Sequence, residues 1–340
     1  MNSTMLATTI DAVGAPWRLQ EVPVPTPAPG QVLVRVHASG ICGTDPYITG
    51  GQLVFRDLPG VPGHEGVGEV VAVGDGVTSR VPGDRVGIIT LQESCGRCAW
   101  CRGGRPLDFV TAGQCPGAVL TGFNVDGAQA EYVVAAAAGT VLLPDALAYR
   151  DAAPIMCIGY TAWSGIRRAD PEPGERIAVA GIGGMGHLAL QYARAAGFET
   201  IAVTATSDKQ EIATRLGADH VVADGAELAA MGGADVLLST TSSNRAAVDA
   251  LQGLAPYGRA VMMGIAFDEF NLANMSMIMN QHSILGSAHN GTPYLVEALD
   301  LAASGAVTPM VETFEAQDVA AAYERAASGR ARFRVVVEYH

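Results

Sequence analysis

The chain has 340 residues, of which 49% are hydrophobic and 16% charged, and its 34 acidic against 21 basic side chains give a net charge of −13. This length predicts about two domains with a sizeable buried core. The acidity argues against nucleic acid and anionic membranes as partners. No apolar run reaches the roughly 18 residues of a membrane span, and no signal-peptide pattern opens the chain. We therefore expect a soluble, cytoplasmic protein that binds neither nucleic acid nor membrane.

The first half of the chain predicts short strands separated by proline and glycine clusters. The β-branched segments that carry this prediction are Trp17–Val22, Gln31–Ala38, Gly66–Val73, Asp84–Ile89 and Tyr132–Ala138. Within the second of them, Val32 to His37 alternate apolar and polar side chains. That alternation is typical of a strand with one face in solvent.

From Arg176 onward, apolar strands alternate with amphipathic helices, which predicts a parallel sheet with crossover helices. The segments are Ile177–Ala180, Met185–Ala196, Thr200–Val203, Lys209–Leu216, Val221–Val222, Val236–Ser239 and Ala260–Met263. A last helix at Ala316–Ser328 and a strand at Phe333–Tyr339 close the chain. Their pattern leaves open which domain they join.

Between the first of these strands and its helix lies the sequence Gly-Ile-Gly-Gly-Met-Gly, at residues 181–186. In a βαβ unit this pattern predicts a dinucleotide-binding turn. Gly181 permits the tight turn, Gly183 lets the backbone approach a pyrophosphate, and Gly186 packs the helix on the strand. The predicted cofactor-binding residues of this turn are Gly181, Gly183, Gly184, Met185 and Gly186. The alternative is a purely structural glycine turn.

The end of the next strand indicates which cofactor is used. NAD sites usually carry an acidic residue there, about 20 residues after the turn, for the ribose 2′-hydroxyl. This chain has Thr204 at that place, followed by the hydroxyls of Thr206 and Ser207 and the cation of Lys209. Small donors and a cation suit a 2′-phosphate, so we predict NADP(H) in preference to NAD(H). Asp208 keeps NAD open if its side chain points inward.

Four of the six cysteines lie in one loop with the spacing Cys95-x2-Cys98-x2-Cys101-x13-Cys115. Four thiolates complete a tetrahedral structural zinc site. The long gap before Cys115 leaves unliganded thiols as the alternative.

The other two cysteines, Cys42 and Cys157, lie on either side of His64 in the sequence. A Cys2His set with an open fourth position is typical of catalytic zinc, because water or a substrate oxygen can bind there. Each residue alone would more often be structural, so the prediction depends on the combination.

Together these motifs resemble the zinc-dependent alcohol dehydrogenases of the medium-chain dehydrogenase/reductase superfamily, over nearly the whole chain. The matching segments are 40–45, 62–70, 84–87, 126–132, Cys157 with Thr161, the turn at 181–186 and 216–219. The resemblance implies an α/β fold with a GroES-like β-barrel catalytic domain at 1–152, completed by 291–340. A Rossmann domain with a doubly wound parallel sheet would occupy 153–290. The cofactor region is most similar to the NADP-using, cinnamyl-alcohol-dehydrogenase-like branch.

The resemblance also implies roles for single residues. Those of the catalytic centre are Cys42, Thr44, Asp45, His64, Glu65 and Cys157. Cys42, His64 and Cys157 would bind catalytic zinc, and Glu65 would approach the metal during ligand exchange. Asp45 would support a ligand, and Thr44 would take the alcohol proton.

Further roles follow for the cofactor and for the second metal site. Thr161 would touch the nicotinamide, and Arg334 would neutralise the pyrophosphate. Cys115 would be the fourth structural ligand, with an insertion around Pro106–Thr111 before it. Tyr47 stands where the family often has a relay histidine, which leaves the outer proton relay open.

The activity that the resemblance implies is the interconversion of alcohols with aldehydes or ketones by hydride transfer, in a homo-dimer or homo-tetramer. An NAD-dependent polyol or amino-alcohol dehydrogenase and an imine or enal reductase are the alternatives on the same scaffold. Zinc-independent quinone reductases and nucleotide sensors lack the Cys/His/Cys set. The residues expected to line the cleft are Leu91, Trp163, Ala288, His289 and Asn290. They do not identify the substrate.

Overall fold

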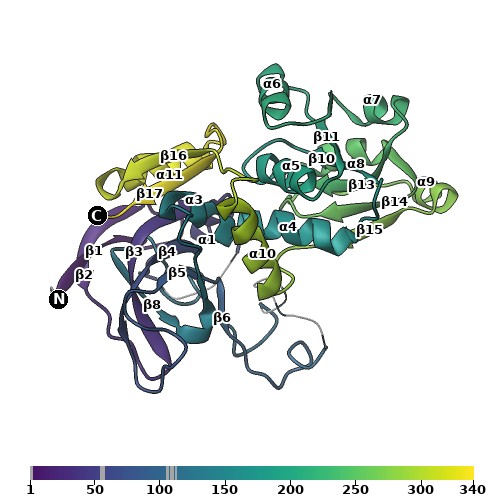
Figure 1. Ribbon diagram of the computed structural model, residues 1–340. Helices are drawn as coiled ribbons and strands as arrows, with labels where there is room; N and C mark the ends of the chain where they lie inside the picture. Colours follow the sequence, from purple (N-terminus) through teal and green to yellow (C-terminus); the bar gives the residue numbers. More distant parts are fainter. Residues whose placement is uncertain (1–2, 54–57, 105–106, 108–110, 112) are drawn as a thin grey trace. The chain divides into compact units, whose positions relative to one another are not determined.

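The computed structural model describes residues 3–53, 58–104, 107, 111 and 113–340. The chain divides into two compact units, Met1–Cys157 with Pro309–His340, and Ile158–Thr308 (Figure 1). Both boundaries lie later than 152 and 290, where the sequence placed them. The second differs because helix α10 (Thr292–Ala303) packs on the helices of the second unit, where Trp163 Nε1 donates a hydrogen bond to Glu297.

The first unit is built around a seven-stranded sheet with the order β16-β17-β3-β4-β5-β9, and β8 also pairs with β3. Its strands are β3 (Gln31–Ile41), β4 (Glu65–Val73), β5 (Arg85–Ile88), β8 (Tyr132–Ala136), β9 (Thr140–Leu142), β16 (Val311–Glu315) and β17 (Arg334–Glu338). Two small sheets complete the described strands: β1 (Thr4–Thr9) with β2 (Arg18–Pro23), and β6 (Leu91–Glu93) with β7 (Val119–Leu120).

The alternation in β3 places Val32, Val34 and Val36 in the core, each at most 1% exposed, while Arg35 faces solvent. Around the sheet lie α1 (Asp45–Thr49), α3 (Tyr149–Ala152), α11 (Val319–Ala327) and the 3-10 turns Ala137–Gly139, Ala153–Met156 and Ala316–Asp318. Strand β17 pairs antiparallel with β3. The C-terminal helix and strand, whose pattern alone left both domains open, therefore belong to the first unit.

The second unit is a six-stranded parallel sheet with the order β12-β11-β10-β13-β14-β15, so the predicted doubly wound Rossmann fold is confirmed. Its strands are β10 (Arg176–Ala180), β11 (Glu199–Val203), β12 (His220–Val222), β13 (Ala234–Ser239), β14 (Leu254–Met262) and β15 (Ser283–Gly286). Its helices are α4 (Ile158–Ala169), α5 (Gly186–Ala195), α6 (Ser207–Arg215), α7 (Gly225–Ala230), α8 (Asn244–Leu251), α9 (Asn274–Asn280) and α10.

Strand β10 lies between β11 and β13. The chain adds β11 and β12 on one side of β10 and then crosses over to add β13, β14 and β15 on the other side. In such sheets, ligands bind beyond the carboxyl ends of the strands at this switch point. The glycine turn follows β10 at this place. Within the described part of the chain, none of the helices combines the length and hydropathy that a membrane span requires.

Candidate active site

Four side chains from three separate segments meet in the first unit. One ligand atom from each of Cys42, His64, Glu65 and Cys157 lies within 4.8 Å of the others. Cys42 directly follows β3, His64 and Glu65 stand at the start of β4, and Cys157 follows the 3-10 turn Ala153–Met156. None of the four is more than 4% exposed. The structure thus brings together the catalytic set that the sequence predicted.

The geometry of this cluster fits a tetrahedral metal ion. The Sγ atoms of Cys42 and Cys157 lie 3.9 Å apart, far beyond the roughly 2.05 Å of a disulfide bond. Two thiolates on one tetrahedral zinc, each at about 2.3 Å, lie about 3.8 Å apart. His64 Nε2 is buried without a hydrogen-bond partner among the described residues. A zinc ion would engage both sulfurs and this nitrogen.

Asp45 supports two of these ligands at once. Its Oδ2 accepts a hydrogen bond from the backbone N–H of Cys42 at 2.7 Å, and its Oδ1 lies 3.3 Å from His64 Nδ1. Burial lowers the pKa of His64, but the Asp45 carboxylate and the Cys42 sulfur together outweigh burial and raise the pKa well above its usual value. The Asp45 carboxylate therefore lies on the Nδ1 side of the ring, which is the usual place for a group that orients a metal-binding histidine.

Glu65 is held next to the cluster by an ion pair. Arg334 Nη2 donates to both carboxylate oxygens at 2.7 and 2.6 Å, and the two side chains are only 5% and 0% exposed. Burial raises the pKa of Glu65, while the Arg334 guanidinium opposes that rise. A side chain at Gly40 would overlap Glu65 Oε2, so the glycine leaves the room that the carboxylate occupies. The structure thus shows Arg334 engaged with Glu65, and its role toward a pyrophosphate stays a prediction.

Thr44 places a hydroxyl beside the cluster. Its Oγ1 lies 3.6 Å from Cys42 Sγ, and the residue is 7% exposed. Thr44 occupies the N-cap position of α1 without making a side-chain capping bond, so helix capping does not engage this hydroxyl. Tyr47 lies half-buried on the same short helix.

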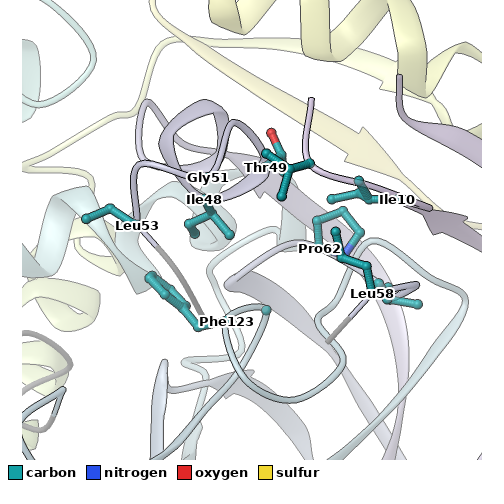
Figure 2. A pocket seen from close by; sticks show the side chains of 12 residues that line it. Ile10, Ile48, Thr49, Gly51, Leu53, Leu58, Pro62 and Phe123 are labelled. Carbon is teal, nitrogen blue, oxygen red and sulfur yellow. The ribbon is translucent and has the colours of Figure 1, made fainter. Parts of the chain in front are cut away.

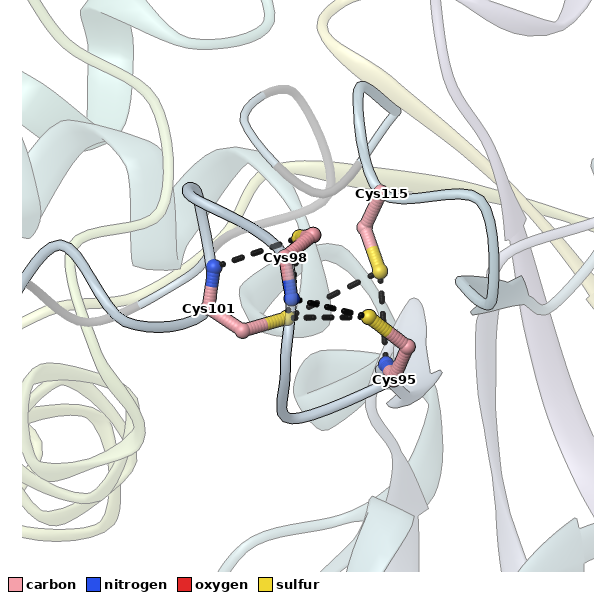
Figure 3. A group of neighbouring side chains, drawn as sticks. All are labelled: Cys95, Cys98, Cys101 and Cys115. Carbon is pink, nitrogen blue, oxygen red and sulfur yellow. Dashed lines mark hydrogen bonds between the residues drawn. The ribbon is translucent and has the colours of Figure 1, made fainter.

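The four cysteines of the loop also converge (Figure 3). The Sγ of Cys101 lies 3.8 Å from that of Cys95, 3.4 Å from that of Cys98 and 3.7 Å from that of Cys115. These separations suit four thiolates around one zinc and exclude disulfides. Of the insertion predicted around Pro106–Thr111, only residues 107 and 111 lie within the described residues.

A small apolar pocket of about 70 Å³, partly open to solvent, lies in the same unit as the catalytic cluster (Figure 2). Its lining includes Ile10, Ile48, Leu53, Leu58 and Phe123. The Phe123 ring also packs against the imidazole of His64, with ring centroids 5.4 Å apart. The predicted cleft residue Leu91 packs against the small apolar cluster that Phe123 forms with Leu120.

The glycine turn has the geometry that a dinucleotide requires. Gly181 has a φ of +89°, and a Cβ at Gly186 would overlap the Gly181 carbonyl oxygen. A Cβ at Gly183 would meet nothing within 4 Å, so it would point into open space. Thr240 Oγ1 donates to Gly181 O at 2.6 Å and holds the turn against the end of β13. Gly184 and Met185 complete the turn before α5.

Around the expected 2′-phosphate position, the side chains differ in exposure. Thr204 is buried, and its N–H donates to Val222 O. Thr206, Ser207 and Asp208 are exposed and Lys209 is half-buried, at the beginning of α6. The structure thus places Thr206, Ser207 and Lys209 at the beginning of α6, and buries Thr204 directly after β11.

The remaining predicted contacts lie along α4 and the loop after β15. Thr161, 5% exposed, stands one turn after Cys157 in the chain. His289 stacks on Tyr160 with centroids 4.0 Å apart, and Gly291 N–H donates to the Tyr160 hydroxyl. Asn290 Nδ2 donates to Ser164 O at 3.3 Å. This loop is therefore fixed on α4 by contacts that the sequence did not predict.

Two residues near the metal cluster were not singled out from the sequence. Phe123 belongs to a stretch without a metal-binding pattern, and only its contact with His64 reveals it. Gln129 lies inside the matching segment 126–132, but its buried amide connects strands that are distant in sequence. Such long-range contacts leave no local pattern.

Comparisons with known proteins agree with this geometry. Residues 28–145 match the family model of the alcohol dehydrogenase GroES-like domain, and residues 184–304 match that of the zinc-binding dehydrogenases. An alcohol dehydrogenase of Geobacillus stearothermophilus is 36% identical, over 98% of this chain and 99% of its own length.

Solved structures are similar over the whole chain as well. One titled an NAD-dependent alcohol dehydrogenase has a TM-score of 0.89 and 30% identity, covering 99% of this chain and 100% of that one. A putative zinc-binding dehydrogenase from Sinorhizobium meliloti, bound to NADP, has a TM-score of 0.89 and 26% identity, with the same coverage. The chain is therefore an oxidoreductase that belongs to the zinc-dependent alcohol dehydrogenases of the medium-chain dehydrogenase/reductase superfamily.

Proposed function

We propose that this protein interconverts alcohols with aldehydes or ketones by hydride transfer, with NADP(H) in preference to NAD(H). The observation that carries the proposal is the buried set of two sulfurs and one imidazole nitrogen, with the Thr44 hydroxyl beside it. Three protein ligands leave one tetrahedral position for a substrate oxygen. The family itself is shown by the comparisons above, whereas the individual residue roles and the cofactor preference are our proposal.

Each residue of the cluster has a distinct task. Cys42, His64 and Cys157 would hold the zinc, and Asp45 holds two of these ligands in place. When bound, the zinc supplies Lewis acidity toward the substrate oxygen, and the nicotinamide supplies the hydride chemistry. Thr44 Oγ1 would accept the proton that the alcohol gives up. The burial of the set keeps bulk water away from this proton and from the ligand atoms.

The substrate class follows from the apolar pocket. Phe123 is shared between the pocket wall and the contact with His64, so an alcohol with its oxygen at the metal would place its carbon chain along this wall. The lining offers methyl groups and an aromatic face, with the Thr49 hydroxyl as its side-chain polar group. We therefore propose alcohols and aldehydes with a hydrocarbon substituent. Polyols, which need several hydrogen-bond partners, would bind less well.

The cofactor proposal depends on the glycine turn and the beginning of α6. The open space at Gly183 suits a pyrophosphate, and Thr206, Ser207 and Lys209 would bind a 2′-phosphate. Thr161 would contact the nicotinamide, and Arg334 would neutralise phosphate charge. The NAD-dependent reaction is the alternative, because Asp208 lies in the same segment and one similar structure is titled NAD-dependent.

Assembly and location complete the proposal. A homo-dimer or homo-tetramer is supported by the exposed apolar side chains of α9, where Met275 and Met279 are 62% and 73% exposed, near the end of the sheet that β15 forms. A cytoplasmic location would keep the ligand thiols reduced. Mass measurement in solution tests the assembly, and a monomer would contradict it.

Two experiments test the central proposal. Metal analysis should find about two zinc ions per chain, and Cys42→Ala should lose one of them and all turnover while still binding nucleotide. Normal turnover by Cys42→Ala would refute the mechanism. A panel of alcohols and aldehydes should show higher kcat/KM with NADPH than with NADH. The variant Lys209→Ala should lower kcat/KM for NADPH alone, and a wild-type preference for NADH of about tenfold or more would overturn the cofactor proposal.

A further inference from the structure

We propose that Gln129 is a positioning residue of the catalytic metal centre: its buried amide holds together the two chain segments that carry Cys42 and His64. This inference rests on the proposed function, since it presumes that the cluster binds zinc. It concerns how firmly this chain retains the metal.

The Gln129 side chain is fully buried and uses all its polar atoms for contacts with distant segments. Its Nε2 donates to the backbone carbonyls of Ser39 at 3.4 Å and Gly40 at 3.2 Å. Its Oε1 accepts a hydrogen bond from the hydroxyl of Tyr339 at 3.1 Å. The two carbonyls lie near the C-terminal end of β3, and Cys42 follows Gly40 by two residues.

The backbone around Gln129 holds the other ligand segment. Its N–H donates to Pro62 O at 3.0 Å, and the N–H of Ala128 donates to Gly63 O at 2.9 Å. These are the two residues directly before His64. Gly63 has a φ of +100°, and a Cβ there would lie 2.7 Å from Gln129 Cγ, so the two residues are in close contact. One residue thus joins the end of β3 to the turn that presents His64.

This arrangement points to metal retention and not to general packing alone. Strands β3 and β4 pair directly at Gly40 and Glu65, so the ladder already holds the strands themselves. Beyond the last ladder pair between β3 and β4, Cys42 and His64 are held by Asp45 and by the contacts that Gln129 makes to their two segments. An apolar side chain at 129 would take the amide away from two buried carbonyls and from the Tyr339 hydroxyl, and the loss of these hydrogen bonds favours local rearrangement. A shift of either segment would change the distance between the Cys42 sulfur and the His64 nitrogen.

The test compares zinc release from full-length wild-type protein and variants in excess chelator. The catalytic zinc is identified as the release phase that Cys42→Ala lacks. In Gln129→Leu we expect this phase to be about tenfold or more faster, as for loss of other outer-shell partners, and the release of the second zinc to stay unchanged. Tyr339→Phe removes only one of the three side-chain bonds, so it should accelerate the same phase less. The visible absorption of the cobalt-substituted variants should shift in the same order.

Gln191→Leu is the matched control. Gln191 is also a buried glutamine with three side-chain hydrogen bonds, to His187 O and to the backbone of Thr308, but it lies in the second unit. Its loss should leave both release phases unchanged. Release at the wild-type rate in both Gln129→Leu and Tyr339→Phe would overturn the inference. If Gln129→Leu fails to fold, Tyr339→Phe alone decides. If the wild type holds no zinc that depends on Cys42, the proposed function itself is wrong.

Discussion

In the glycine turn, a single added methyl group at residue 183 should weaken cofactor binding without lowering the stability of the fold. A Cβ at Gly183 meets no protein atom within 4 Å, and its φ lies outside the left-handed region. Gly183→Ala should therefore leave the apo protein as stable as the wild type, or more stable by about 0.4–1 kcal/mol through a less flexible unfolded chain. The methyl group would occupy the space that the pyrophosphate needs.

The expected loss of affinity follows from the hydrogen bonds at stake. If the phosphate must retreat from one backbone N–H, a bond to a charged group worth about 1.5–3 kcal/mol is lost. This corresponds to a dissociation constant for NADPH that is roughly 10- to 150-fold larger. Gly186→Ala provides the contrast, because its Cβ would overlap the Gly181 carbonyl oxygen. That variant should lose about 1–3 kcal/mol of folding stability as well as cofactor affinity.

Urea unfolding of the cofactor-free proteins and fluorescence titration with NADPH measure the two quantities separately. The reasoning predicts that Gly183→Ala changes only the titration and that Gly186→Ala changes both. Unaltered NADPH affinity in Gly183→Ala would refute the assignment of this turn to the pyrophosphate. A loss of stability in Gly183→Ala equal to that in Gly186→Ala would show that the open space is filled in solution.

Three further predictions concern charges and thiols. In urea unfolding, Arg334→Met should lower the free energy of unfolding by about 3–5 kcal/mol, because Glu65 is left buried without its partner. The double variant Arg334→Met with Glu65→Gln should lower it by less than the single variant does. Arg259→Met should lower the free energy of unfolding at pH 7 by about 1–2 kcal/mol, because the hydrogen bonds between Arg259 and Glu175 are lost. These hydrogen bonds lower the pKa of Glu175 below its ordinary 4.5. The ionised Glu175 stabilises the fold above that value, so the difference from wild type should shrink as unfolding is followed to lower pH. Cys115→Ser should release one of the two zinc ions by metal analysis and retain the NADPH affinity of the wild type.

The sequence predicted those parts of the fold that repeat a local pattern. Strand β10, the glycine turn and α5 lie where the apolar runs and glycines placed them, because each depends on neighbouring residues. Strand β15 was missed because its four residues, Ser-Ile-Leu-Gly, are too few to show a period, and helix α4 was missed although its sequence is amphipathic.

The same division applies to the site. Cysteine and histidine ligands could be named from the sequence because few other residue types bind zinc. The pairing of Arg334 with Glu65 joins residues that are 269 positions apart, and no spacing indicates it. The contact of Phe123 with His64 and the bonds of Gln129 arise in the same way, from tertiary contacts between segments that are distant in sequence. The chemistry of the ligands was thus predictable, whereas the contacts that position them were not.

The placement of both metal groups in one unit makes a last prediction possible. Among the described residues, the two groups able to hold a metal ion belong to the first unit, and the second unit contributes no ligand. Two sulfurs 3.9 Å apart in a buried site repel each other once both are ionised, so the metal-free form is less stable. Zinc that is present at about 1,000 times its dissociation constant would stabilise the folded state by about 4 kcal/mol, as any ligand does that binds only the folded form. Removal of zinc should therefore accelerate amide hydrogen exchange in β3 and β4 and leave β10 and β13 unchanged. Equal acceleration in both units, or none, would show that zinc is not bound where the cysteines and His64 meet.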